Sequence, residues 1–132
     1  MPLILERATE RNIETLTCDA YNDDPTRVRR VARIMPSDNT FDTAGVLLKA
    51  IADPVRARIL FALTVEPLCV CELAALLEMS MPAISHHLKI LALSGLLKVK
   101  KQGKFACYYF KDAHFGRTLT TLISDLAAHQ TL

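Results

Sequence analysis

Two short apolar stripes joined by a polar turn are the feature that most constrains how this chain can fold. Within residues 71–79, apolar side chains recur at the spacing of one helical face. They are Leu73, Leu76 and Leu77. Ser80 can cap a second helix, in which Pro82 falls near the first turn and which Gly95 can end. The pattern predicts two helices connected by a tight turn.

The second of these helices places polar side chains opposite its apolar face. The apolar residues are Ile84, Leu88 and Leu91, and the polar ones are Ser85, His86, His87 and Lys89. This arrangement favours a helix-turn-helix motif, in which the second helix reads DNA. The alternative interpretation is an ordinary pair of packed helices.

Directly after this pair comes "LLKVKKQGKFACYYF" (96–110), which alternates around Gln102 and Gly103 and predicts a two-stranded hairpin. Its lysines are Lys98, Lys100, Lys101 and Lys104. A basic hairpin after a reading helix is typical of a wing that contacts phosphates. The formal net charge of only +2 therefore does not exclude DNA binding, because the positive charge is clustered.

The remaining segments predict further helices. Residues 1–27 are charged and irregular, residues 28–35 can form a short helix that Pro36 stops, and a helix is expected over about 41–52. Another begins at Pro54 and ends before Pro67. A final amphipathic helix has a single apolar stripe. The stripe consists of Phe115, Leu119, Leu122, Ile123 and Leu126.

We therefore predict a mainly α fold with a small β-hairpin wing, a homodimeric winged helix-turn-helix. Residues 1–40 are expected to form an N-terminal arm that carries Cys18, and residues 41–132 a DNA-binding and dimerisation domain. No stretch approaches the roughly 18 apolar residues of a membrane span, and the first residues turn charged too early for a signal peptide. A cytoplasmic protein without a membrane partner is expected, with cysteines that are thiols or metal ligands rather than disulfides.

Cys69 and Cys71 stand one residue apart at the start of the first helix of the motif. If the backbone there is extended, both sulfurs can turn to one side and bind a soft ion such as Zn(II), Cd(II), Pb(II) or As(III). Two thiolates are an incomplete site, which Cys18 of the arm can extend. The alternative is that Cys69 and Cys71 are small buried apolar residues, the role expected for Cys107 in the wing.

A second candidate metal site lies on the last helix. Asp112, His114, Asp125 and His129 carry groups that Zn(II) accepts. In a two-fold antiparallel pairing of this helix with its copy, the first two residues of one subunit would meet the last two of the other. The alternative is that all four are ordinary solvated side chains.

From about residue 41 to 130 the chain resembles the ArsR/SmtB family of metal-sensing winged-helix repressors. The resemblance rests on "LKAIADPVRARIL", "LCVCELA", "SHHLKIL", "SGLLKVKKQGKFACYYF" and "DAH". The arm with Cys18 further resembles the CadC-like branch, which senses cadmium, lead and zinc. This likeness implies a homodimer that represses a metal efflux or sequestration operon and leaves its operator DNA when the metal binds.

The resemblance also implies roles for individual residues. Cys69 and Cys71 match the paired ligands of the branch and Cys18 matches its first arm cysteine, whereas Asn22 stands where a second arm cysteine is usual. On the last helix, Asp112, His114 and Asp125 match ligand positions. The final ligand position falls on Ala128, one residue before His129.

The sequence thus predicts a metal-responsive repressor with Zn(II), Cd(II) or Pb(II) as inducer and double-stranded operator DNA as partner, not an enzyme. Arsenite sensing and thiol-redox sensing on the same fold are alternatives. A metal carrier is an alternative from a different class, against which the lysine-rich wing argues.

Overall fold

The computed structural model describes residues 25–130, and the chain divides into two compact units, Met1–Gly45 and Val46–Leu132. In the first unit, helix α2 spans Pro25–Ile34 and has no buried residue. It begins three residues before the helix expected over 28–35, so the prediction of irregular structure is wrong for residues 25–27. Proline fits the first turn of a helix because it has no N–H to lose there.

Helix α3 spans Asp38–Ile51 and crosses the boundary between the units. It starts earlier than the predicted residue 41 because Ser37 caps it: the Ser37 Oγ accepts from the Thr40 N–H at 3.2 Å. Helix α4 spans Pro54–Val65, as the sequence predicted. The Asp53 carboxylate caps α4 by accepting from the N–H groups of Val55 and Arg56 at 2.9 and 3.0 Å.

The predicted helix pair is present as α5 (Val70–Leu77) and α6 (Met81–Leu93). Glu78 ends α5 with a φ of 54°, a left-handed conformation that turns the chain. Ser80 then caps α6 by accepting from the Ala83 N–H at 3.3 Å. The tight turn between the helices thus comes from a left-handed residue followed by a serine cap.

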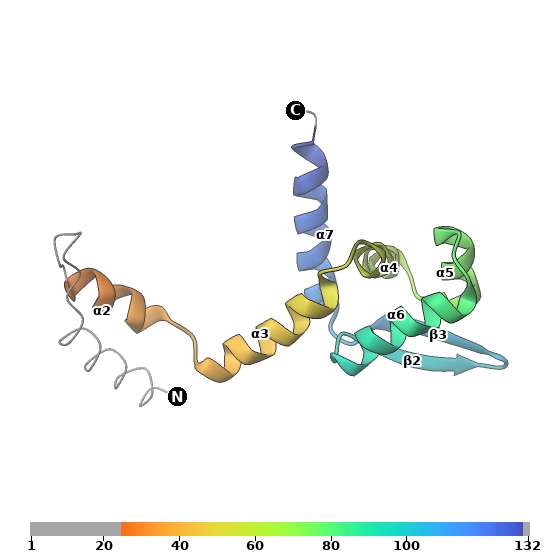
Figure 1. The fold of residues 1–132 in the computed structure, drawn as a ribbon, viewed down its shortest axis with the longest axis horizontal. Helices are drawn as coiled ribbons and strands as arrows, with labels where there is room; N and C mark the ends of the chain where they lie inside the picture. The colour runs from red at the N-terminus through yellow and green to blue at the C-terminus, as the bar shows by residue number, and fades with distance from the viewer. Residues whose placement is uncertain (1–24, 131–132) are drawn as a thin grey trace. The chain divides into compact units, whose positions relative to one another are not determined.

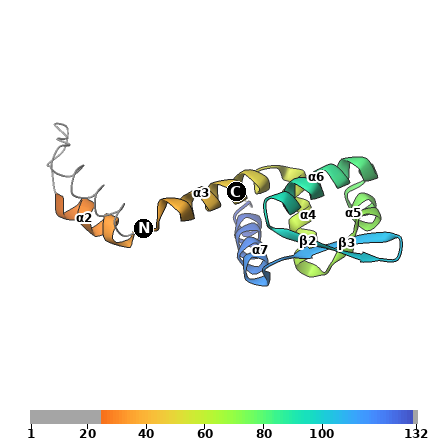
Figure 2. The same cartoon turned by 90° about the horizontal axis from the view of Figure 1, so that it is seen from below.

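Three strands form one antiparallel sheet in the order β1-β3-β2. The hairpin consists of β2 (Leu97–Gln102) and β3 (Phe105–Phe110), with Gly103 at a φ of +63° in its turn. The third strand, β1 (Leu68–Cys69), was not predicted; it pairs with β3 so that Cys69 lies opposite Cys107. In both views the tip of the hairpin points away from α7 (Figures 1 and 2).

The core of the second unit lies where α4, α5, α6, the sheet and α7 (Ala113–Ala128) meet. Its fully buried large side chains are Ile59, Leu60, Leu73, Ile84, Leu88 and Leu91. The apolar stripe predicted on α7 divides into two parts. Leu119 is buried and Ile123 packs against the core, whereas Leu122 and Leu126 are 54% and 56% exposed. One face of α7 therefore lacks an apolar partner within the described residues of this chain.

Candidate DNA-binding surface and metal-binding residues

Helix α6 presents the polar face that the sequence predicted. Its apolar residues anchor it in the core, which leaves Ser85, His86 and Lys89 exposed on the opposite side. The Ser80 cap sets the start of this helix, and Ser94 and Gly95 close its end. A helix held on one face and polar on the other can lie in a DNA groove without disturbing the core.

His87 is placed differently from its neighbours on α6. It is half-buried, and its Nδ1 lies 3.4 Å from the Nη1 of Arg56 at the start of α4. The His86 and His87 rings meet edge to face, with centroids 5.8 Å apart. The sequence predicted that both histidines face solvent. The structure corrects this for His87, because α4 packs close enough for Arg56 to reach it.

The wing carries its lysines at the surface. Lys98, Lys100, Lys101 and Lys104 are all exposed. Successive residues of a strand point to opposite faces, so Lys100 and Lys101 lie on different sides of the hairpin. The two sides of a narrow hairpin can contact phosphates on either side of a groove, which is the chemistry expected of a wing.

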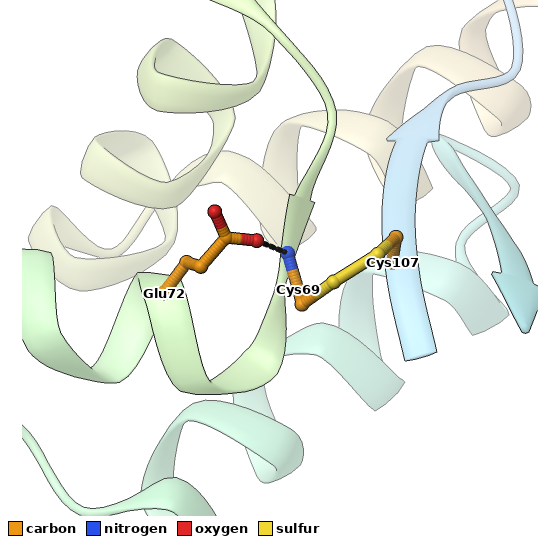
Figure 3. A group of neighbouring side chains, drawn as sticks. All are labelled: Cys69, Glu72 and Cys107. Carbon is orange, nitrogen blue, oxygen red and sulfur yellow. Dashed lines mark hydrogen bonds between the residues drawn. A yellow bond between two sulfur atoms is a disulfide. The ribbon is translucent and has the colours of Figure 1, made fainter. Parts of the chain in front are cut away.

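The sheet brings together two cysteines that the sequence did not connect. Cys69 ends β1 and caps α5, and Cys107 lies opposite it in β3 with their Cα atoms 3.9 Å apart. A disulfide joins their sulfurs (Figure 3). The sequence predicted thiols or metal ligands rather than disulfides, and the structure corrects this for Cys69 and Cys107. Cys107 is buried, as predicted, but it is also bonded rather than merely packed.

A carboxylate lies beside the two sulfurs. Glu72, in the first turn of α5, accepts a hydrogen bond from the Cys69 N–H at 2.9 Å through Oε1 (Figure 3). One ligand atom from each of Cys69, Glu72 and Cys107 lies within 4.8 Å of the others. The amide Oε1 of Gln102 is 3.9 Å from the Cys107 sulfur. Among the described residues, this is the group of metal-ligating side chains that the fold assembles.

The other predicted thiolate ligands stand apart from this group. Cys71 is a free, half-buried thiol in α5 and does not belong to the cluster. Cys18 lies outside the described residues, so its predicted role stays a prediction. Sequence reasoning missed the partnership of Cys107 because a two-residue strand such as β1 has no periodicity to reveal its pairing.

The candidate ligands of α7 occupy the two ends of that helix. The Asp112 Oδ1 caps α7 by accepting from the His114 N–H at 2.9 Å, and the His129 N–H donates to the Asp125 carbonyl at 3.2 Å. All four residues are exposed. Asp112 and Asp125 are separated by about 20 Å of helix at 1.5 Å per residue. One chain cannot bring both pairs together, so the predicted site requires a second α7.

Similarity to known proteins supports this assignment of elements. Residues 53–99 match the model of the family described as bacterial regulatory protein, arsR family. A cadmium resistance transcriptional regulatory protein, a CadC homolog of Staphylococcus aureus, is 37% identical over 67% of this chain and 73% of its own length. A transcriptional repressor SmtB homolog of Synechocystis is 35% identical over 77% and 76%.

A solved structure shares the same fold. It is the homodimeric winged helix-turn-helix DNA-binding domain of a Mycobacterium bovis protein, with a TM-score of 0.63 over 74% of this chain and 92% of that one, at 23% identity. The predicted winged helix-turn-helix fold is thereby confirmed. No helix within residues 25–130 is both long and apolar enough to cross a bilayer.

Proposed function

The chain belongs to the ArsR family of bacterial regulatory proteins, and on that basis we propose that it is a metal-responsive repressor. It binds operator DNA as a homodimer and leaves the DNA when Zn(II), Cd(II) or Pb(II) binds. One observation carries the proposal. The polar face of α6 is exposed beside a hairpin whose lysines are exposed as well, so a reading helix and a phosphate-binding wing occupy one unit.

DNA recognition divides between these two elements. Ser85, His86 and Lys89 can reach base edges and nearby phosphates in the major groove. Lys100, Lys101 and Lys104 neutralise phosphates, which adds affinity but no sequence preference. His87 contributes indirectly, because its half-buried ring contacts Arg56 of α4 and so helps to hold α6 in place.

Exposed apolar side chains support the homodimer. Leu122 and Leu126 leave the α7 stripe half uncovered, and Val46 and Leu48 of α3 are 56% and 65% exposed. Pairing two copies through such helices would remove these side chains from water. A two-fold dimer can then present two α6 helices at a spacing of about 34 Å, one turn of DNA apart.

The metal response rests on thiolates at the start of the reading unit. Cys69 is the N-cap of α5 and Cys71 lies in the first turn of that helix. Cys18 from the arm of the partner subunit can join them as a third ligand. Thiolates favour soft ions, and the relative from Staphylococcus aureus is named for cadmium resistance. An ion that ties an arm to α5 would favour a dimer geometry whose reading helices no longer match the operator. By thermodynamic reciprocity, operator DNA must weaken metal binding by the same factor.

The ends of α7 offer a second inducer site across the dimer. Asp112 and His114 of one subunit would meet Asp125 and His129 of the other, with oxygen and nitrogen donors suited to Zn(II). A substitution of Asp112 would remove the N-cap of α7 as well as a candidate ligand, because the Asp112 carboxylate accepts from the His114 N–H. The variant to use is His114→Ala with Asp125→Ala, which leaves that cap intact. Loss of the zinc response alone would assign zinc to α7 and leave cadmium and lead to the thiolates.

The decisive experiment measures operator affinity at fixed salt and under reducing conditions, with and without each metal. The wild-type dimer should bind its operator when metal-free and lose at least tenfold in affinity when loaded with Cd(II) or Pb(II). Cys71→Ser should bind DNA normally and respond less, and Ser124→Ala, which changes no sulfur and lies on α7 rather than on the reading helix, should bind and respond as wild type does. Equal operator affinity of the metal-free and loaded wild type would overturn the metal response. Absence of sequence-specific DNA binding would overturn the repressor itself.

A thiol-redox response is a second candidate, favoured by the disulfide between Cys69 and Cys107. Hydrogen peroxide can oxidise the two thiols to one disulfide and is itself reduced to two molecules of water. Operator release by peroxide in metal-free buffer, reversed by dithiothreitol, would support this function. Release by metal with no effect of peroxide would exclude it.

A further inference from the structure

We propose that Cys107 of the wing is a metal ligand, and that Cys69 and Cys107 of one subunit together bind a soft divalent cation with the Glu72 carboxylate beside them. This inference rests on the proposed metal response and assigns to it a ligand from a different element. The site would lie within a single subunit, where β1, α5 and β3 meet.

The backbone places the two sulfurs for this role. Cys69 and Cys107 are directly opposed partners in an antiparallel ladder, so their side chains leave the sheet on the same face. Two Zn–S bonds of 2.3 Å at a tetrahedral angle hold their sulfurs about 3.8 Å apart. The ligand atoms of Cys69, Glu72 and Cys107 lie within 4.8 Å of one another. They are therefore close enough to share one metal ion once the disulfide is reduced.

The site forms only after the disulfide is reduced. Two thiol molecules such as glutathione supply two electrons and two protons: the Cys69–Cys107 bond breaks, each sulfur gains a proton, and the reductant becomes a disulfide. Metal binding then displaces both thiol protons into solvent, because thiolates are the ligands. A reducing compartment keeps the pair available to metal.

The third donor is held near the sulfurs by a backbone contact. The Glu72 Oε1 accepts from the Cys69 N–H at 2.9 Å, and a carboxylate oxygen of Glu72 lies within 4.8 Å of both sulfurs. Glu72 is exposed, so its carboxylate can turn toward an ion without leaving a buried site. A set of two thiolates and one carboxylate still has a coordination position open for water or for a further sulfur.

An ion at this position would act directly on the DNA-binding parts. Cys69 is the N-cap of α5, the first helix of the reading motif, whereas Cys107 belongs to the wing. Across the wing, Cys107 is also paired with Lys100 of β2, so the thiolate ligand and a phosphate-binding lysine are neighbours. Binding therefore joins the helix-turn-helix to the wing and can shift one against the other.

The test compares Cys107→Ser, Cys107→Val and wild type as full-length protein, with Cd(II) as the probe under anaerobic, reducing conditions. Wild type should show thiolate-to-cadmium absorption that falls in both variants, together with an affinity loss of at least tenfold. Valine suits a buried strand position, so it retains the fold if serine does not. Ser124→Ala, at an exposed position of α7 that is not a proposed ligand, serves as the control and should keep the wild-type absorption and cadmium affinity.

Protection of the cysteines adds a measurement that requires no variant. Cd(II) should slow alkylation of both Cys69 and Cys107 in wild type, read by mass spectrometry of the labelled peptides. Equal cadmium affinity and absorption in wild type and Cys107→Val, with Cys107 alkylated at an unchanged rate, would overturn this inference. Operator release by cadmium in both proteins would leave the proposed function standing, whereas no release in wild type would refute that function instead.

Discussion

The Nη1 atom of Arg56 lies 3.4 Å from the Nδ1 atom of His87, so the start of α4 supports the reading helix from inside the domain. The same arginine donates from Nε to the Ala50 carbonyl at 2.6 Å, and its Nη1 lies 4.0 Å from Asp53 Oδ2. Arg56 thus connects the end of α3, the cap of α4 and the middle of α6. The two adjacent histidines of α6 therefore have different surroundings.

The first prediction separates these histidines. His86→Ala should leave the melting temperature unchanged and weaken operator binding by about 1–3 kcal/mol if the ring contacts a base. His87→Ala, by contrast, should lower the free energy of unfolding by about 0.5–1.5 kcal/mol, because it removes the partner of Arg56. Thermal melts and operator titrations of both variants check this. Identical melting temperatures would contradict the supporting role of His87.

The second prediction concerns the wing. Each lysine that contacts a phosphate contributes about 0.9 to the slope of log affinity against log salt, so Lys101→Ala in both subunits should reduce the slope by about 1.8. The loss should be the same on operator and on unrelated DNA. Lys111→Ala is the matched control, because it removes the same charge from an exposed residue beyond the end of β3. Equal slopes for the two variants would argue against a phosphate-binding wing.

Much of this fold could be predicted because its elements carry local signals. Asp53 and Ser80 cap helices where the sequence placed helix starts, and Gly95 and Gly103 adopt positive φ values at a helix end and a hairpin turn. The reading face of α6 followed from a 3.6-residue period. Such features depend on residues close together in the sequence, which is where pattern reasoning is strongest.

The cysteine site could be predicted only in part. The short spacing of Cys69 and Cys71 drew attention to them, but Cys107 is 38 residues from Cys69 and joins it through the pairing of β1 with β3. A two-residue strand next to a helix cap is too short to show the alternation of apolar and polar residues that predicts a strand. Similarly, the contact of His87 with Arg56 spans 31 residues and depends on how α4 and α6 cross.

The third prediction tests the core beneath the reading helix. Leu88 is fully buried, and Leu88→Ala should lower the free energy of unfolding by about 2–5 kcal/mol because it leaves a cavity. Leu93→Ala makes the same change in the same helix at a residue that is 79% exposed, and should cost less than about 0.5 kcal/mol. Chemical denaturation of both variants checks the difference. Similar losses would mean that α6 is oriented differently.

The fourth prediction is a pH dependence at the cap of α4. The backbone N–H of Arg56, which donates to the Asp53 carboxylate, lowers the pKa of Asp53 from its ordinary value of 3.8. A lowered pKa means that the ionised cap stabilises the fold above pH 3.8 and that this stabilisation is lost as pH falls through the folded-state pKa. Asp53→Asn keeps a capping oxygen but does not titrate. The melting-temperature difference between wild type and this variant should therefore shrink below pH 3.8, and a constant difference from pH 7 to 3 would contradict the assignment.

The fifth prediction concerns the uncovered face of α7. Leu122 and Leu126 are one helical turn apart and more than half exposed, although the rest of the stripe reaches the core. If a second copy covers them, Leu122→Glu would bury a carboxylate in an apolar interface, which is costly unless the charge is paired. The variant should sediment as a monomer at concentrations where wild type is a dimer.

A control in the same helix makes the dimer prediction specific. Ser124→Glu adds the same charge two residues further on, at an exposed position on the opposite side of α7, and should leave the dimer intact. If two reading helices act together on a palindromic operator, as proposed, Leu122→Glu should also lose operator affinity while its far-ultraviolet circular dichroism stays native. A dimeric Leu122→Glu protein, or dissociation by Ser124→Glu, would place the interface on another surface, and then the four candidate ligands of α7 could not meet across it.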